Sequence, residues 1–235
     1  MMTFSDVDRK TIQEWSEDEI FFHSSDSKDA LDYLHNRGIT NDIIKKFNIG
    51  YVPKEAGHNL SGRIIMPLFD QHNKLVCLTT RDFSKEAYLP HWHESFDKTK
   101  YLYGLNVSKN DIFRFNKVIV VEGQFDTHVM HKHGLSITVA ALGGAFSIDH
   151  VCLLRRYCTD FYLWFDPDDA GNKASERAMN MYEELNLSLF GINFIPIFIN
   201  ENLDPDQFVE KYGKLKVIEI MKKSKEEITR KKQAC

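Results

Sequence analysis

Two stretches of the chain decide its fold: KVIVVEGQFD at residues 117–126 and FYLWFDPDDAG at residues 161–171. Each contains an uninterrupted apolar run, which is the pattern of a strand buried on both faces of a sheet. Each run ends directly in acidic residues. A helix-forming segment then follows. Buried strands that alternate with helices are typical of parallel strands joined by right-handed crossovers.

The same alternation continues on both sides of these stretches. SITVA (136–140) and INFIPIFI (192–199) read as two further strands. Helices are expected from the first acidic motif to about His133, from a Ser147 cap through Arg156, and over residues 172–185. The region therefore predicts a layered α/β domain built on a parallel sheet.

A different pattern precedes residue 117. Residues 27–38 and 40–47 predict two short helices, and a further helix is expected around residues 12–20 of the extension before them. RIIMPLFD (63–70) and LVCLTTRDF (75–83) flank the turn-like residues 70–73 and predict an antiparallel hairpin. Residues 84–100 have no clean period and predict a loop. This part should form a smaller, mixed α+β subdomain.

The composition is that of a globular protein, with 43% hydrophobic and 27% charged residues over 235 positions. No apolar run approaches the ~20 residues that span a membrane, and the polar start predicts no signal peptide. The four scattered cysteines form no C-x-x-C pair, which indicates a reducing cytoplasm and argues against zinc. The net charge of −4 does not exclude nucleic acid, because bound divalent ions reverse the field around clustered acids.

Acidic residues follow three of the four expected strands. Glu122 follows the first, Asp166 and Asp168 follow the third, and Asp204 and Asp206 come shortly after the fourth. A single acidic turn is ordinary turn chemistry. Three acidic strand ends on one edge of a sheet would repel one another unless a cation lay among them. The pattern therefore predicts a site for Mg²⁺ or Mn²⁺, ions that prefer oxygen ligands.

The ordered motifs EG-x-x-D, D-x-D-x-A-G and DPD resemble the Toprim signature of primases, topoisomerases and several nucleases. The flanking segments ALDYLHNRGITNDIIKKFNIGYVP, GRIIMPLFDQHNKLVCLTTRDF and KYLYGL resemble the RNA-polymerase core of DnaG-like replicative primases. The similarity covers roughly Ala30 to Gly213. It implies an extension over residues 1–24, an α+β subdomain over 25–116, a Toprim domain over 117–213 and a basic helix over 214–235.

The resemblance also implies roles for particular residues. Glu122, Asp166 and Asp168 would be catalytic, and two or more Mg²⁺ or Mn²⁺ ions, without zinc, would be held by an acidic set. That set is Glu122, Asp126, Asp166, Asp168, Asp204 and Asp206. Template and nucleotide would contact Arg81, Lys98 or Lys100, with Arg37 and Arg63 as lesser candidates. Trp92, Tyr101 and Tyr103 could stack on bases, although core packing is the commoner role for such residues.

The implied activity is template-dependent synthesis of short RNA primers from ribonucleoside triphosphates on single-stranded DNA. No Cys/His module precedes the core and no helical domain follows it, so we expect a separate zinc-bearing initiation factor and a replicative helicase as partners. A phage or mobile-element origin, acting in the cytoplasm of a bacterial host, fits such a reduced core. No membrane partner is expected.

Other functions remain open at this point. A Toprim nuclease would use the same acids, and a non-catalytic subunit could bind single-stranded DNA or a helicase. A topoisomerase would need a nucleophilic tyrosine on a further domain. The histidines at 91, 93, 128, 131 and 133 and the basic residues at 155–156 and in the tail are given structural or solvated roles first. The segment Leu142-Gly143-Gly144 fits equally an ordinary tight turn and a phosphate contact through its backbone N–H groups.

Overall fold

A computed structural model of the chain describes residues 27–56, 60–84, 91–93, 95–143, 146–199 and 201–233. The chain divides into two compact units, residues 1–96 and 97–235. The domain limits expected from the sequence, with a boundary after residue 116, stay a prediction. The expected helix near residues 12–20 lies outside the described residues. Among the residues described, each helix is too short or too polar to cross a lipid bilayer.

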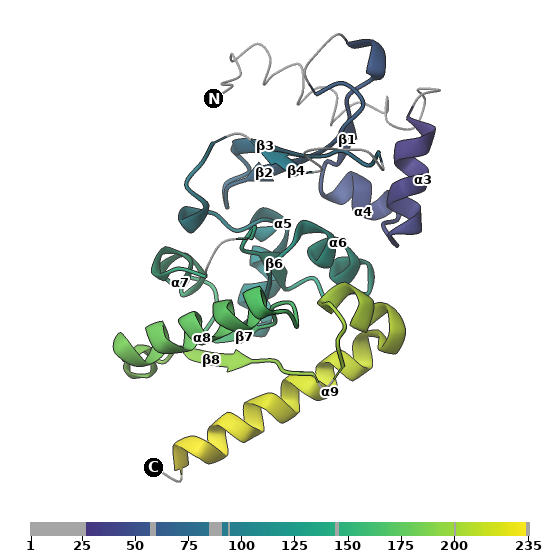
Figure 1. Cartoon of the computed structure of the whole chain (residues 1–235). Helices are drawn as coiled ribbons and strands as arrows, with labels where there is room; N and C mark the ends of the chain where they lie inside the picture. Colours follow the sequence, from purple (N-terminus) through teal and green to yellow (C-terminus); the bar gives the residue numbers. More distant parts are fainter. Residues whose placement is uncertain are drawn as a thin grey trace. The chain divides into compact units, whose positions relative to one another are not determined.

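The first unit contains two helices and a small antiparallel sheet (Figure 1). The elements are α3 (Lys28–Asn36), α4 (Asn41–Lys46), β1 (Gly50–Tyr51), β2 (Ile64–Phe69), β3 (Leu75–Arg81) and β4 (His91–His93), and the strand order is β1-β2-β3-β4. The two helices and the central hairpin confirm the sequence predictions. Asp70 closes the hairpin turn, because its Oδ1 accepts the backbone N–H groups of His72 and Lys74 at 2.8 and 2.9 Å.

The loop predicted over residues 84–100 is wrong in part. Strand β4 lies within this segment and pairs with β3, and a 3₁₀ helix, η2 (Lys98–Lys100), follows in the second unit. The sequence carries no alternation over three residues that would reveal such a strand. β4 exists because β3 offers it an open edge, which is a tertiary effect.

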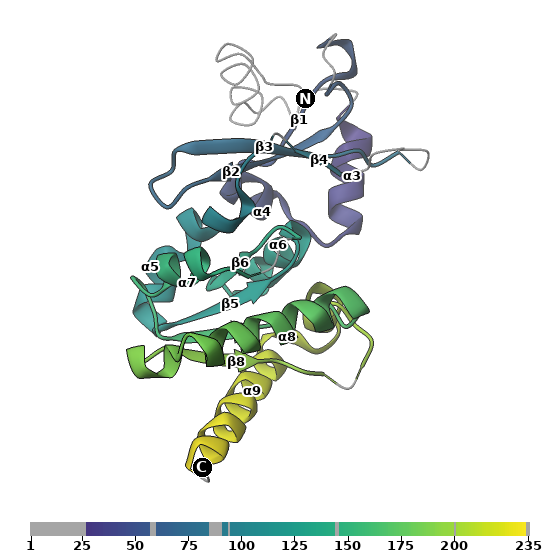
Figure 2. The ribbon, with the colours of Figure 1, turned by 60° about the vertical axis from the view of Figure 1, so that its left-hand side comes forward.

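The second unit is built on a four-stranded parallel sheet, as predicted. Its strands are β5 (Lys117–Val121), β6 (Thr138–Ala140), β7 (Asp160–Leu163) and β8 (Asn193–Pro196), in the order β6-β5-β7-β8. The helices are α5 (Leu105–Phe115), α6 (Gln124–Lys132), α7 (Ile148–Leu154), α8 (Asp169–Glu184) and α9 (Pro205–Gln233), with the 3₁₀ helix η3 (Leu187–Phe190) after α8. Figure 2 shows α6 and α8 beside these strands.

Helix α5 was not predicted, and α9 is longer than the basic helix expected from residue 214. Gly213 explains the second difference. Its φ of 75° and ψ of 171° interrupt α9, so a first segment begins at Pro205 and a second segment begins at Lys214. The predicted basic helix is this second segment.

The core of the second unit explains why the sheet holds its strand ends in place. Residues 118–121 of β5 are fully buried, and Phe146, Phe161 and Phe194 pack against one another with ring centroids 5.6–6.3 Å apart. Burying each such aromatic side chain stabilises the fold by roughly 1.5–3 kcal/mol. A rigid sheet of this kind can present the side chains that follow its strands at fixed positions.

Candidate active site

The acidic residues of the first two motifs meet at the carboxyl edge of the parallel sheet. Strands β5 and β7 are hydrogen-bonded neighbours, so the segments that follow them emerge side by side. Glu122 follows β5, and its Oε1 accepts the backbone N–H of Asp166 at 3.2 Å. The two motifs, 44 residues apart in the chain, are therefore in direct contact.

Gly171 makes this contact possible. A Cβ added at Gly171 would lie 2.1 Å from the backbone oxygen of Asp166 and 2.7 Å from Glu122 Oε1. Neither the backbone nor the carboxylate could stay in place at those distances. No role was predicted for Gly171, although its position at the end of D-x-D-x-A-G was a usable signal.

Asp168 has a structural task in addition to its charge. It is the N-cap of α8, and its Oδ1 accepts the backbone N–H of Gly171 at 2.8 Å. An N-cap acid satisfies a free N–H group and complements the positive end of the helix dipole. Asp168 is thereby held beside Asp166 in a defined orientation.

Asp126 links the first motif to the beginning of α9. Its Oδ2 accepts the N–H of Gly123 at 3.1 Å, and its Oδ1 accepts the N–H of Asp206 at 3.3 Å. Burial, with the neighbouring Asp206 and Asp166, raises the pKa of Asp126 well above its ordinary value. Asp126 therefore fastens the segment that carries Asp204 and Asp206 to the motif after β5.

The carboxylates influence one another's protonation. Burial and the nearby Glu122 raise the pKa of Asp166 to about 7, with smaller contributions from Asp204, Asp168 and Asp206. Burial also raises the pKa of Glu122, against the hydrogen bond from the Asp166 N–H, and Asp168 and Asp204 add to the rise. The other five predicted acids thus lie within electrostatic reach of Asp166, which is partly buried.

One feature of the acidic residues favours a bound divalent cation, and another shows that their side chains are not already arranged around one. Asp166 Oδ1 is buried and has no hydrogen-bond partner among the described residues, which is costly for a carboxylate unless an ion is bound there. However, no three His, Cys, Asp or Glu side chains in the described ranges form a group arranged to hold a metal ion. The acids are neighbours, but the six predicted ligands do not form one ligand set.

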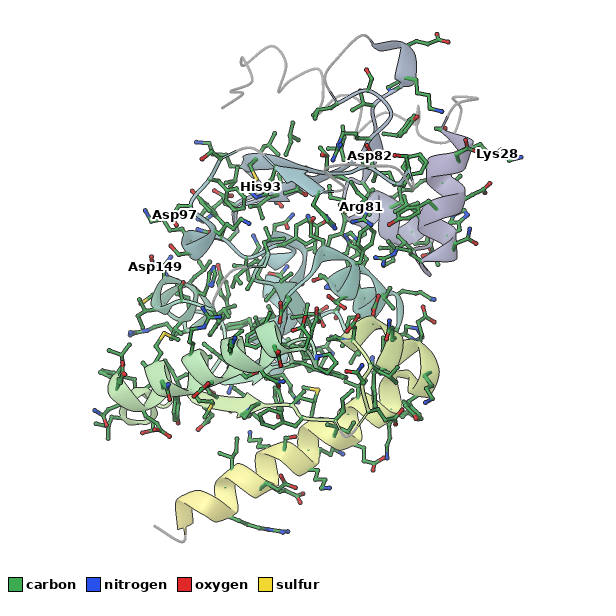
Figure 3. All side chains as sticks on the ribbon, in the orientation of Figure 1. Lys28, Arg81, Asp82, His93, Asp97 and Asp149 are labelled. Atoms are coloured by element: carbon green, nitrogen blue, oxygen red, sulfur yellow. The ribbon has the colours of Figure 1, made fainter. Side chains whose placement is uncertain are left out.

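The predicted arginines gather in the first unit. Arg63 Nε donates to Thr80 Oγ1 at 2.9 Å, and its guanidinium pairs with Asp82 at 3.3 Å. Arg81 lies at the end of β3, where Figure 3 labels it beside Asp82. The charges of Arg81, Arg37 and Arg63 together lower the pKa of His91, after burial as the largest cause.

His91 is a member of this cluster that the sequence analysis placed in a structural role. It pairs with Arg81 across strands β3 and β4, and its Nε2 contacts the Arg81 guanidinium. Arg81 Nε is buried and has no partner within the described ranges. The cluster Arg37, Arg63, Arg81 and His91 therefore brings three guanidinium groups together, and that of Arg63 pairs with Asp82.

The two predicted lysines belong to the second unit. Lys98 and Lys100 lie on η2, where Lys100 pairs with Asp97 at 3.2 Å and both side chains of that pair are about half exposed. His150 fixes the segment to α7, because its Nε2 lies 2.9 Å from the backbone oxygen of Lys98. Figure 3 labels Asp97 and Asp149 in this region.

The structural interpretation of the α6 histidines holds, but the partly exposed helix expected there is wrong. His128 and His131 are buried, and His128 Nε2 bonds to the Tyr103 hydroxyl at 2.8 Å. Tyr103 is thus a core residue. The side chain of Trp92 and the residue Gly144 lie outside the described part of the chain, whereas Leu142 and Gly143 form a turn with positive φ.

Comparison with known proteins adds to this geometry. The family model of the Toprim domain matches residues 116–191, and that of the N-terminal domain of the DNA primase catalytic core matches residues 19–61. A DNA primase of Chlamydia pneumoniae is 30% identical over 250 residues, covering 91% of this chain. The chain belongs to the DnaG primases by its catalytic core.

The match is to a part of the longer relatives. The chain spans 42% of the Chlamydia primase. Its fold is that of solved DnaG cores. The DnaG catalytic core superposes with a TM-score of 0.79 at 23% identity, covering 91% of this chain and 78% of that one. A DnaG primase catalytic domain bound to single-stranded DNA gives 0.76 at 23% identity, covering 92% and 81%.

Proposed function

We propose that this DnaG-type core synthesises short RNA primers on a single-stranded DNA template, using ribonucleoside triphosphates and divalent metal ions. One observation carries the proposal. Carboxylates from three segments of the chain meet at the carboxyl edge of the Toprim sheet, around a buried Asp166 oxygen that has no partner among the described residues. One structural neighbour, a DnaG primase catalytic domain, is bound to single-stranded DNA, which supports the choice of template.

Glu122, Asp166 and Asp168 would be the principal ligands of two or more Mg²⁺ or Mn²⁺ ions, with Asp204 and Asp206 adding negative charge. Such ions, when bound, neutralise phosphate charge and stabilise the attacking and leaving oxygens of an in-line displacement. The protein's own contribution is placement. Asp166 and Glu122 are held by their mutual hydrogen bond, and Asp168 by its N-cap bond.

Asp126 would act through position in this scheme. Both of its oxygens already accept backbone N–H groups, from Gly123 and Asp206. It therefore keeps the acidic segment before α9 at the site and need not bind an ion itself. Glu122 suits the role of general acid or base better than Asp126 does, because it is only half-buried and its pKa is raised.

Arg81, Arg63 and Arg37 would bind phosphates of the template or of the incoming nucleotide, with Lys98 and Lys100 as further contacts. Guanidinium groups suit this task because they form two parallel hydrogen bonds to a phosphate. The protein would act in the cytoplasm with a replicative helicase and a zinc-bearing initiation factor as partners.

The test is an assay with single-stranded DNA, labelled ribonucleotides and Mg²⁺ or Mn²⁺. The variant Asp166→Asn/Asp168→Asn should lose roughly a hundredfold or more of dinucleotide synthesis, because the main metal-binding charges are gone. Asp169→Asn is the matched control, since Asp169 follows directly in the chain, is exposed and lies in the first turn of α8. It should retain nearly full activity.

The products separate the competing functions. RNA products from the wild type, lost in the double variant, support a primase. Shortened DNA without RNA would instead identify a Toprim nuclease. Wild-type activity in the double variant would remove these acids from the mechanism. If the chain makes no primers alone, the assay is repeated with a helicase and a zinc-bearing initiation factor, and continued failure would contradict the proposal.

A further inference from the structure

A cationic trough lies along the second segment of α9, at the amino ends of β5 and β7. Two cavities, of about 300 and about 460 Å³, make up the trough. They adjoin because both are lined by Lys117, Tyr162 and Lys222. The acidic residues follow the opposite ends of the same strands, so the trough is a separate site from the carboxylate cluster.

One face of α9 supplies most of the trough. Its lining residues on the helix are Lys214, Ile218, Met221, Lys222, Lys225, Glu226, Thr229 and Arg230. Steps of three and four residues place side chains on the same helix face. At 1.5 Å per residue the face from Lys214 to Arg230 is about 24 Å long. Figures 1 and 2 show this segment extending beyond the strands.

The two cavities differ in chemistry. The smaller one is mainly apolar, with the side chains of Phe115, Leu135, Ile137, Ile218 and Met221 around it. Phe115 is 48% exposed, and the Arg114 guanidinium lies over its ring, 5.3 Å from the ring centroid. Leu135, Ile137 and Met221 are each less than 8% exposed, so the apolar floor is narrow. A narrow apolar slot beside an exposed aromatic ring suits a flat heterocycle.

The larger cavity is cationic. Four cationic side chains line it, and the whole trough has five: Lys117, Lys214, Lys222, Lys225 and Arg230. Two carboxylates lie near them, Glu226 in the lining and Asp160 paired with Lys225, which leaves an excess of three positive charges. Lys225 pairs with Asp160, and Arg230 lies 3.9 Å from Glu226. Lys117 and Lys222 form no ion pair with any described residue.

Tyr162 lines both cavities. Burial and the neighbouring Asp160 raise the pKa of its phenol to about 12, so the hydroxyl keeps its proton at neutral pH. A protonated hydroxyl can donate to a phosphate or ribose oxygen.

We propose that the trough binds a nucleotide, with the base in the apolar slot beside Phe115 and the phosphates against Lys117, Lys222 and Arg230. A free nucleoside triphosphate and one unit of a single strand share this chemistry. An acidic partner helix is disfavoured, because a helix needs a broad apolar face and most of these apolar side chains are already covered. The proposal goes beyond primer synthesis and does not depend on it.

The test measures binding by fluorescence anisotropy in EDTA, where the carboxylate site cannot hold phosphates through metal ions. The probes are labelled ATP and a labelled oligothymidylate, with inorganic tripolyphosphate and an oligoglutamate peptide as competitors. The variant Lys222→Glu/Arg230→Glu should weaken nucleotide binding about tenfold or more. Phe115→Ala should weaken it several-fold. Both changes are on exposed positions, and circular dichroism checks the fold.

Two controls fix the site. Lys223→Glu makes the same charge change as Lys222→Glu, which is half that of the double variant, at a neighbouring helix position that does not line the trough, and should change the affinity less than twofold. Lys216→Glu makes the same change at another exposed position of α9 that does not line the trough, and should likewise change the affinity less than twofold.

Binding of ATP that is lost in the trough variants but kept in both controls supports a free nucleotide as the ligand. Binding of the oligonucleotide alone with the same pattern supports a strand as its source. The proposal is overturned if neither probe binds, or if Lys223→Glu acts like Lys222→Glu/Arg230→Glu. It is also overturned if tripolyphosphate or oligoglutamate competes as well as ATP while Phe115→Ala has no effect.

Discussion

The two sheets of this molecule position functional residues of opposite charge, acids in the second unit and arginines in the first, and they do so in different ways. The parallel sheet of the second unit places acids directly after its strands, so that neighbours in the sheet become neighbours in the site. The antiparallel sheet of the first unit gathers arginines through its register, because Arg81 stands opposite Ile64 on one side and His91 on the other. The first arrangement is visible in a sequence and the second is not.

The largest effect on primer synthesis is expected from a substitution that displaces the acids of the parallel sheet without removing a charge. Gly171→Ala would place a Cβ 2.1 Å from the Asp166 backbone oxygen and 2.7 Å from Glu122 Oε1. Such overpacking costs about 1–3 kcal/mol of stability and displaces both acids. Primer synthesis should fall roughly a hundredfold or more, because small misplacements at a catalytic centre cost that much.

The comparison variant is Ala174→Gly, on the same helix and away from the acids. It should cost only about 1 kcal/mol of helix stability and leave synthesis nearly intact. Urea unfolding and the ribonucleotide assay read the two effects. Full activity in Gly171→Ala would mean that the contact between Glu122 and Asp166 is not needed for catalysis.

A medium effect tests the arginine cluster against the lysines of the second unit. Arg81→Gln should reduce the slope of log affinity against log salt by about one for a single-stranded template, which corresponds to one lost phosphate contact. Lys98→Ala/Lys100→Ala should also flatten the slope, but less per charge, because Lys100 already pairs with Asp97. Anisotropy titrations between low and moderate salt measure both slopes. An unchanged slope in Arg81→Gln would place the template elsewhere.

The smallest effect concerns His150, which fastens η2 to α7. Burial lowers its pKa from the ordinary 6.5, although hydrogen bonds to Lys98 and Tyr101 and the charges of Asp149 and Asp97 oppose this. The unfolded chain therefore binds this proton at a higher pH than the folded one does. The stability from His150 is fully present above pH 6.5 and is lost progressively as the pH falls below it.

The variant His150→Gln cannot titrate and should lack this dependence. The difference in unfolding free energy between wild type and variant, from urea titrations, should be larger at pH 7 than at pH 5. An equal difference at both pH values would show that His150 is not held neutral in the folded state.

The sequence predicted the parallel sheet and its acidic edge because strands buried on both faces appear as apolar runs, and the acids follow the runs at once. It predicted the hairpin for a similar reason. It missed β4 and with it the position of His91, because a three-residue edge strand depends on its partner. It also missed the role of Gly171, although this glycine ends the D-x-D-x-A-G motif, because its close approach to Glu122, 49 residues earlier in the chain, is visible only in the folded structure.

Gly213 divides α9 into a segment fastened to Asp126 and a segment that lines the trough. Its φ of 75° with ψ of 171° is accessible almost exclusively to glycine. A side chain at position 213 would favour one continuous helix in place of two helical segments. The chain could then keep Asp206 bonded to Asp126 or keep the α9 lysines beside β5 and β7, but not both. Gly213 therefore allows one helix to contact both ends of the parallel sheet.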